Sequence, residues 1–165
     1  MHLFQRLIAA FFFLWLPFVT MAADGQVGNR VKYGGGSLQA FKAGEELKLF
    51  VDSDVARLVH KKDTPTLIRG DAITEISYGQ DVRRRIEEAA ALAIFTLGIG
   101  AVVAFSKAKK HYIGLIWNDG TSKGGIVLQA RKDDYRGILL ALEGLTGKKA
   151  IDADAAKNEA KKPSK

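Results

Sequence analysis

Residues 111–149, HYIGLIWNDGTSKGGIVLQARKDDYRGILLALEGLTGKK, contain a pair of strands followed by a helix. Residues 111–117 have an alternating pattern of side chains around Gly114, which predicts one strand, and residues 125–130 are predicted to form the returning strand. Asn118-Asp119-Gly120 between them is a hairpin turn signal. A helix is predicted from about Asp133 to Leu145, and Gly147 is predicted to end it. Its apolar positions recur at helical spacing and form one stripe that faces a core: Tyr135, Ile138, Leu139, Leu142 and Leu145.

Upstream of this region, residues 31–79 have the pattern of short strands separated by turns. Residues 45–51 alternate between apolar and mostly polar side chains, as a half-buried strand does. Asp52-Ser53-Asp54 and Pro65 mark turns, and Gly34-Gly35-Gly36 predicts a bulge or a close backbone approach. The sequence therefore predicts a mainly β fold with some α structure, of about seven strands and a terminal amphipathic helix.

This order resembles the pleckstrin-homology-like (PH-like) superfold, a bent barrel or two packed sheets whose open end is capped by a C-terminal helix. More narrowly, residues 24–149 are similar to a group of small exported bacterial proteins with a PH-like or GRAM-like domain. The resemblance implies a fold and an envelope location, and it brings no established activity. It is carried by Val31-Lys32-Tyr33-Gly34-Gly35-Gly36, Ile76-Ser77-Tyr78-Gly79-Gln80, residues 105–112 (FSKAKKHY) and residues 142–148 (LEGLTGK).

The N-terminal 23 residues predict a signal peptide. Arg6 precedes an apolar run from Leu7 to Val19, which is shorter than the ~20 residues that cross a bilayer. Small residues then predict cleavage after Ala22 or Ala23, and an uncleaved anchor is the alternative. The 165-residue chain has no cysteine, which excludes a disulfide framework and fits a bacterial envelope protein.

Residues 89–105 contain no charged side chain, and three interpretations of this insertion stay open. A helix near 81–97 leads through Gly98 and Gly100 into a strand, or the segment dips into one leaflet of a membrane, or it spans the membrane. Seventeen helical residues measure about 25 Å, which is short for a span. The two flanks are both basic, so they give no positive-inside asymmetry.

The predicted contact residues for an anionic lipid or a partner protein lie around this insertion: Arg83, Arg84, Arg85, Phe95, Lys107, Lys109 and Lys110. In an alternative interpretation, the arginines form an exposed first helical turn that pairs with Glu87 and Glu88. The lysines would then be the solvated rim of the barrel. His111, beside them, is interpreted as a rim residue rather than a catalyst.

No catalytic, cofactor or metal site is predicted. Gly34-Gly35-Gly36 matches no phosphate-binding loop, the serines lack a nucleophile-elbow context, and Asp52-x-Asp54 does not continue as a calcium loop. Residues 106–165 hold 13 basic and 7 acidic residues, but six of those bases lie from Lys148 onward. The domain itself is only mildly basic, so nucleic acid is not expected as a partner.

Residues 150–165 predict a disordered, lysine-rich tail. The expected function is a non-catalytic, exported binding or scaffolding module of the bacterial envelope, attached to an anionic membrane surface or to an envelope protein. The alternatives are a single-pass membrane protein spanning at 89–105 and a soluble periplasmic interaction domain. The sequence does not define an oligomeric state.

Overall fold

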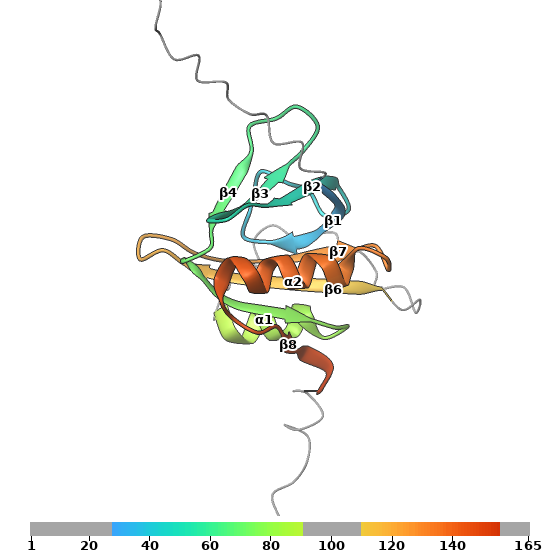
Figure 1. The fold of residues 1–165 in the computed structure, drawn as a ribbon, viewed down its shortest axis with the longest axis vertical. Coiled ribbons are helices and arrows are strands. Elements are labelled where there is room, and N and C mark those ends of the chain that lie inside the picture. Colours follow the sequence, from blue (N-terminus) through green and yellow to red (C-terminus); the bar gives the residue numbers. More distant parts are fainter. Residues whose placement is uncertain (1–27, 91–109, 156–165) are drawn as a thin grey trace, which may run out of the picture.

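The computed structural model describes residues 28–90 and 110–155 (Figure 1). The predicted signal peptide at 1–23, most of the insertion at 89–105 and the last part of the predicted tail therefore lie outside the described residues. Among the described residues, no helix is both long and apolar enough to span a membrane. The elements are β1 (Asn29–Gly36), β2 (Glu46–Val51), β3 (Val55–Val59), β4 (Thr66–Arg69), β5 (Ile73–Tyr78), α1 (Val82–Ala90), β6 (His111–Asn118), β7 (Lys123–Ala130), α2 (Tyr135–Thr146) and β8 (Ile151–Asp152).

The strands form one eight-stranded sheet in the order β4-β3-β2-β1-β7-β6-β5-β8. Two antiparallel meanders, β1–β4 and β5–β7, are joined because β1 pairs with β2 on one side and with β7 on the other. Among the strands of the described residues, only β8 is parallel to its neighbour, β5. The prediction of a mainly β fold with few helices is confirmed, and the sheet is mixed and does not close on itself.

The glycines of β1 allow this strand to join the two meanders. The register between β1 and β7 shifts between Tyr33 and Gly35, so the predicted irregularity is present. Gly36 has a φ of 145°, and a Cβ on it would lie 2.2 Å from the carbonyl oxygen of Gly125. No side chain fits there, because the two backbones approach too closely.

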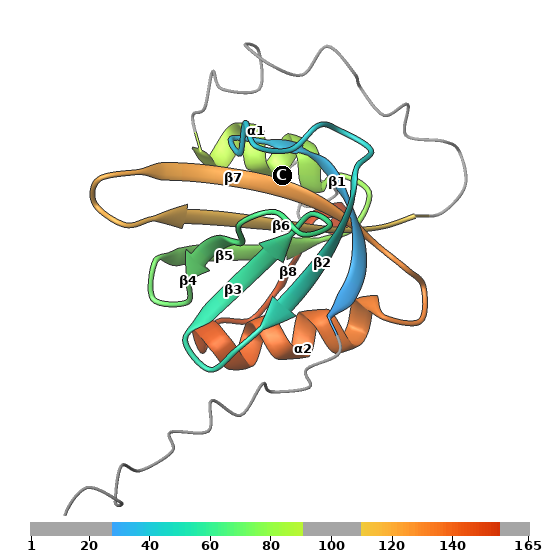
Figure 2. The same cartoon turned by 90° about the horizontal axis from the view of Figure 1, so that it is seen from above.

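The main core lies between the inner face of the sheet and α2 (Figure 2). The predicted apolar stripe of α2 is confirmed: Ile138 and Leu142 are fully buried, and the other three residues of the stripe pack partly buried against the same core. Gly147 ends the helix in a left-handed conformation, and its N–H donates to the carbonyl of Glu143. The inner face of the sheet contributes alternate residues of each strand, including Leu47, Leu49, Leu58, Ile76, Leu115 and Leu128.

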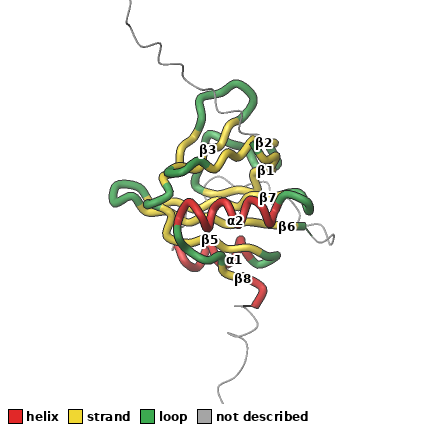
Figure 3. Tube along the Cα trace, in the orientation of Figure 1, coloured by secondary structure: helices red, strands yellow, loops and turns green. Residues whose placement is uncertain are grey.

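A second apolar layer lies on the opposite, outer face of β5–β7, where α1 packs (Figures 2 and 3). Because helices cover this part of the sheet on both faces, residues 112–117 of β6 are all buried. The predicted alternation of buried and exposed positions in this strand is therefore wrong. Strands covered on both faces have continuous apolar runs instead.

The fold continues past the predicted domain end at residue 149. Ile151 pairs with Ser77 and Asp152 with Tyr78 to make β8, and Ala153 is buried beside α1. The first residues of the predicted disordered tail thus belong to the described fold. Their order comes from pairing with β5, an interaction that the polar composition of the tail does not reveal.

Candidate functional site

Helix α1 is held against the sheet by two glycines of the strands beneath it. A Cβ on Gly114 would lie 2.6 Å from Cγ1 of Val82 and 2.8 Å from Cδ1 of Ile86. A Cβ on Gly125 would lie 2.7 Å from Cγ2 of Ile86. The helix therefore packs directly on strand backbone, and this contact fixes where the arginines of α1 lie.

The arginine run does not act as one exposed cluster. The guanidinium of Arg85 donates to both carboxylate oxygens of Glu75 on β5, at 2.8 Å and 3.1 Å. Both side chains are largely buried, with exposed fractions of 27% for Arg85 and 18% for Glu75. Arg85 thus fixes α1 to β5 and is not available to a ligand. Arg83 and Arg84 lie half-buried on the same helix.

The predicted lysine cluster is described at one position only. Lys110 lies half-buried just before β6, and its backbone carbonyl accepts a hydrogen bond from the side-chain amide of Gln80. This bond connects the residues just before α1 to the residue just before β6. Phe95, Lys107 and Lys109 lie outside the described residues.

His111, the first residue of β6, makes a structural contact. Its ring stacks on Tyr135 of α2 with a centroid distance of 4.0 Å and an interplanar angle of 8°. Nearby, burial raises the pKa of Tyr112 above its usual value. Tyr112 is buried in one cluster with Val82 and Ile86 of α1, so His111 contacts α2 and Tyr112 contacts the outer layer that contains α1.

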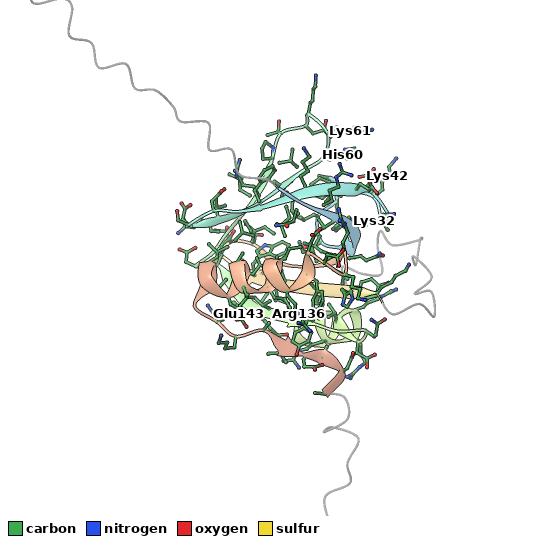
Figure 4. The ribbon with its side chains drawn as sticks, turned by 45° about the vertical axis from the view of Figure 1, so that its right-hand side comes forward. Lys32, Lys42, His60, Lys61, Arg136 and Glu143 are labelled. Atoms are coloured by element: carbon green, nitrogen blue, oxygen red, sulfur yellow. The ribbon has the colours of Figure 1, made fainter. Side chains whose placement is uncertain are left out.

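The sheet brings together a second basic group, which we call the basic groove: Arg30, Lys32, Glu46, Gln129 and Arg131, with Val31 and Ala130 between them. The groove has a volume of about 180 Å³ and is open to solvent. Lys32 is exposed on β1 and is labelled in Figure 4. Three cations and one carboxylate face this space, so its charge is net positive.

The register of the sheet explains the groove. Val31 pairs with Ala130 and Lys32 with Gln129, so Arg30 and Arg131 flank the same strand pair. On the other side of β1, Arg30 pairs with Lys48 and Lys32 with Glu46. Val31 and Ala130 point into the core, and the charged residues alternate with them on the outer face. Strands β6 and β7 carry α1 on that same outer face.

The groove is not visible in the sequence, because Arg30 and Arg131 are 101 positions apart. Alternation in residues 30–32 was the one available signal, since basic residues flank an apolar one there. Only the pairing of β1 with β7 brings Arg131 to the same place. The predicted residues Arg83–Arg85 do not line the groove.

The described ranges, 28–90 and 110–155, hold no cluster of three or more His, Cys, Asp or Glu side chains that is suited to a metal ion. No protein-family model matches the sequence, and no curated protein matches it significantly.

Proposed function

We propose that this chain is a non-catalytic, exported PH-like module of the bacterial envelope that attaches to an anionic membrane surface. The observation that carries the proposal is the outer face of the sheet, which presents the basic groove on β1 and β7 and carries α1 on β5–β7. Basic residues near a membrane surface each contribute about 1 kcal/mol of attraction to anionic headgroups. Residues 91–109, which are apolar up to residue 105, follow α1 directly.

The PH-like assignment is supported by the topology. Strands β1–β7 followed by a C-terminal helix over the core agree with the order of about seven strands and a helix on which the resemblance rests. The two-residue strand β8 is an addition to this scheme, and α1 lies between the first two strands of the second meander. The proposed apolar helical insertion near 81–97 begins with α1.

The pairing of β5 with β6 supports attachment to a membrane surface and argues against a single membrane-spanning segment at 89–105. Tyr78 pairs with Ile113 in one antiparallel ladder, so the strands on either side of the insertion belong to one sheet. A single crossing would put those strands in different compartments, where they could not form hydrogen bonds with each other. We therefore propose that residues 90 and 110, which border the insertion, lie on the same side of the membrane.

The test is flotation of the purified protein with vesicles. We expect the protein to float with vesicles that contain phosphatidylglycerol and to stay behind with pure phosphatidylcholine. One molar salt shortens the screening length from about 8 Å to about 3 Å and should reduce this binding. Phe95→Ser should lower the fraction of the protein that stays bound to the vesicles in one molar salt, since it removes an apolar group from the insertion. Protein that stays behind with both kinds of vesicle would overturn the proposal.

A periplasmic protein-interaction domain is the second candidate, and the outward face of α2 favours it. Leu140 is 67% exposed there, and apart from the helix's own backbone no atom of the described residues lies within 4 Å of a Cβ placed on Gly137 or Gly144. A partner could approach such a face closely. Crosslinking at Leu140 in intact envelopes distinguishes the two: a specific protein adduct, with no flotation, favours this candidate.

A further inference from the structure

We propose that the basic groove is a binding site for a phosphate-type oxyanion. Arg30 and Lys32 reach it from β1, Arg131 reaches it from the end of β7, and the side-chain amide of Gln129 adds a neutral donor. Arginine suits a phosphate because its planar fork donates two parallel hydrogen bonds to neighbouring oxygens. Two arginines that line one open groove can therefore bind one tetrahedral anion together.

The pattern of like charges is the first argument. Lys48, Arg30 and Arg131 follow one another across β2, β1 and the end of β7, because Arg30 pairs with Lys48 and precedes the Val31–Ala130 pair. Like charges directly opposite each other on neighbouring strands destabilise a sheet. A bound anion would offset this repulsion, and water alone does so less well.

The second argument is that the internal partners of these cations are weak. The Nζ of Lys32 lies 3.8 Å from Glu46, whose side chain is 71% exposed. The Nε of Arg131 lies 3.4 Å from Asp134, with exposed side-chain fractions of 60% for the arginine and 26% for the aspartate. Ion pairs with an exposed cation and separations of this size contribute little. Among the described residues, the side chain of Arg30 makes no ion pair. The donors are therefore available to a ligand.

This inference deepens the proposed function and rests on it for the source of the anion. The phosphate of an anionic lipid headgroup and a free phosphate ion share the same chemistry. A membrane-attached module would meet the lipid headgroup, and the experiment therefore has one arm for each source.

The first arm is an NMR titration of the ¹⁵N-labelled protein with inorganic phosphate, following the Nε–H signals of Arg30 and Arg131. We expect both signals to move in a saturable way. Arg30→Gln/Lys32→Gln should weaken phosphate binding by at least about tenfold, which corresponds to ~1.4 kcal/mol. The matched control is Lys123→Gln/Lys148→Gln, which removes the same charge from two exposed sites outside the groove and should leave the affinity within about twofold. Circular dichroism spectra verify that both variants fold.

The second arm repeats the flotation with both double variants. If the groove variant loses binding to phosphate and to phosphatidylglycerol vesicles while the control keeps both, the ligand is the lipid headgroup. If phosphate binds in the groove and vesicles do not bind the protein, the site is for a free anion and only the proposed function fails. If phosphate leaves the arginine signals unmoved, or both variants lose affinity equally, the groove is not a site, even where vesicles still bind.

Discussion

Oδ1 of Asp154 lies 2.8 Å from the backbone nitrogens of both Gln80 and Asp81, and both N–H groups donate to it. The carboxylate from the end of the described chain thus caps the start of α1, more than seventy residues earlier. It satisfies the N–H groups of the two residues that precede α1 and places a negative charge near the positive end of the helix dipole. Together with β8, it fastens the C-terminal segment to the outer layer.

Loss of this cap should destabilise the protein measurably. We expect Asp154→Ala to lower the free energy of unfolding by about 0.5–2 kcal/mol, the range for helix caps. Urea unfolding provides the measurement. Asp54→Ala, in the exposed turn between β2 and β3, removes the same charge and should change stability by less than about 0.5 kcal/mol. Equal effects of the two changes would mean that the cap does not contribute.

A glycine-to-alanine change should lower the free energy of unfolding at one position and raise it at another. Gly125→Ala places a Cβ 2.7 Å from Cγ2 of Ile86 and should destabilise by about 1–3 kcal/mol through overpacking. Gly144→Ala, on the open side of α2, should stabilise by about 0.5–1 kcal/mol through helix propensity. Thermal unfolding tests both. A neutral result at Gly125 would show that α1 can shift away from the sheet.

The more deeply a leucine of α2 is buried, the more stability its substitution by alanine should cost. Leu142 is fully buried, so Leu142→Ala should cost about 2–5 kcal/mol. Leu139 is only partly buried, so Leu139→Ala should lower the free energy of unfolding by less than Leu142→Ala does. Leu140→Ala, on the exposed side, should change it by no more than about 0.5 kcal/mol. Denaturant unfolding of the three variants gives the order. Any other ranking would contradict the orientation of the helix.

Tyr33 should make the protein lose stability in alkali. Its hydroxyl donates to the carbonyl of Leu38 at 3.1 Å, and burial raises its pKa to about 12. Because the unfolded tyrosine loses its proton near pH 10, the stabilisation is complete below that pH and is lost as the pH rises toward 12. Tyr33→Phe should therefore show a shallower fall in stability between pH 10 and 12. Identical pH slopes for the two proteins would refute this contribution.

Residues before and after the insertion should lie on the same side of the inner membrane. Ser53 and Ser122 are both exposed, and the native chain has no cysteine. Single cysteines at these positions should both react with a membrane-impermeant thiol reagent once the outer membrane is opened. Labelling at Ser53 with protection at Ser122 until lysis would place the two meanders in different compartments and overturn the topology.

Local signals account for the parts of the fold that were predicted. The turn at Asn118-Asp119-Gly120 and the spacing of Ile138 and Leu142 act within a few residues, so the β6–β7 hairpin and α2 are visible in the sequence. Strand β8 has no such signal, because Ile151 and Asp152 are ordered by a partner strand far away in the chain.

The candidate site also contains residues that a local sequence pattern marks and residues that only the fold brings together. A run such as Arg83–Arg85 stands out in a sequence, yet Arg85 is occupied by Glu75, ten positions earlier, which only the docking of α1 on β5 reveals. The basic groove is the converse case, because no charge run marks Arg30 and Arg131. Their proximity follows from strand register alone.

The double pairing of β1 also has a consequence for how the chain folds. Tyr33 pairs with Leu128, a separation of 95 residues (128 − 33), so the sheet cannot be completed until almost the whole folded region is available. Contacts between such distant residues require the closure of a long loop, and folds rich in them form in milliseconds to seconds rather than microseconds. The first meander must therefore wait with one edge of β1 unpaired until β7 arrives. During synthesis, this edge is where the chain is most exposed to pairing with the wrong strand.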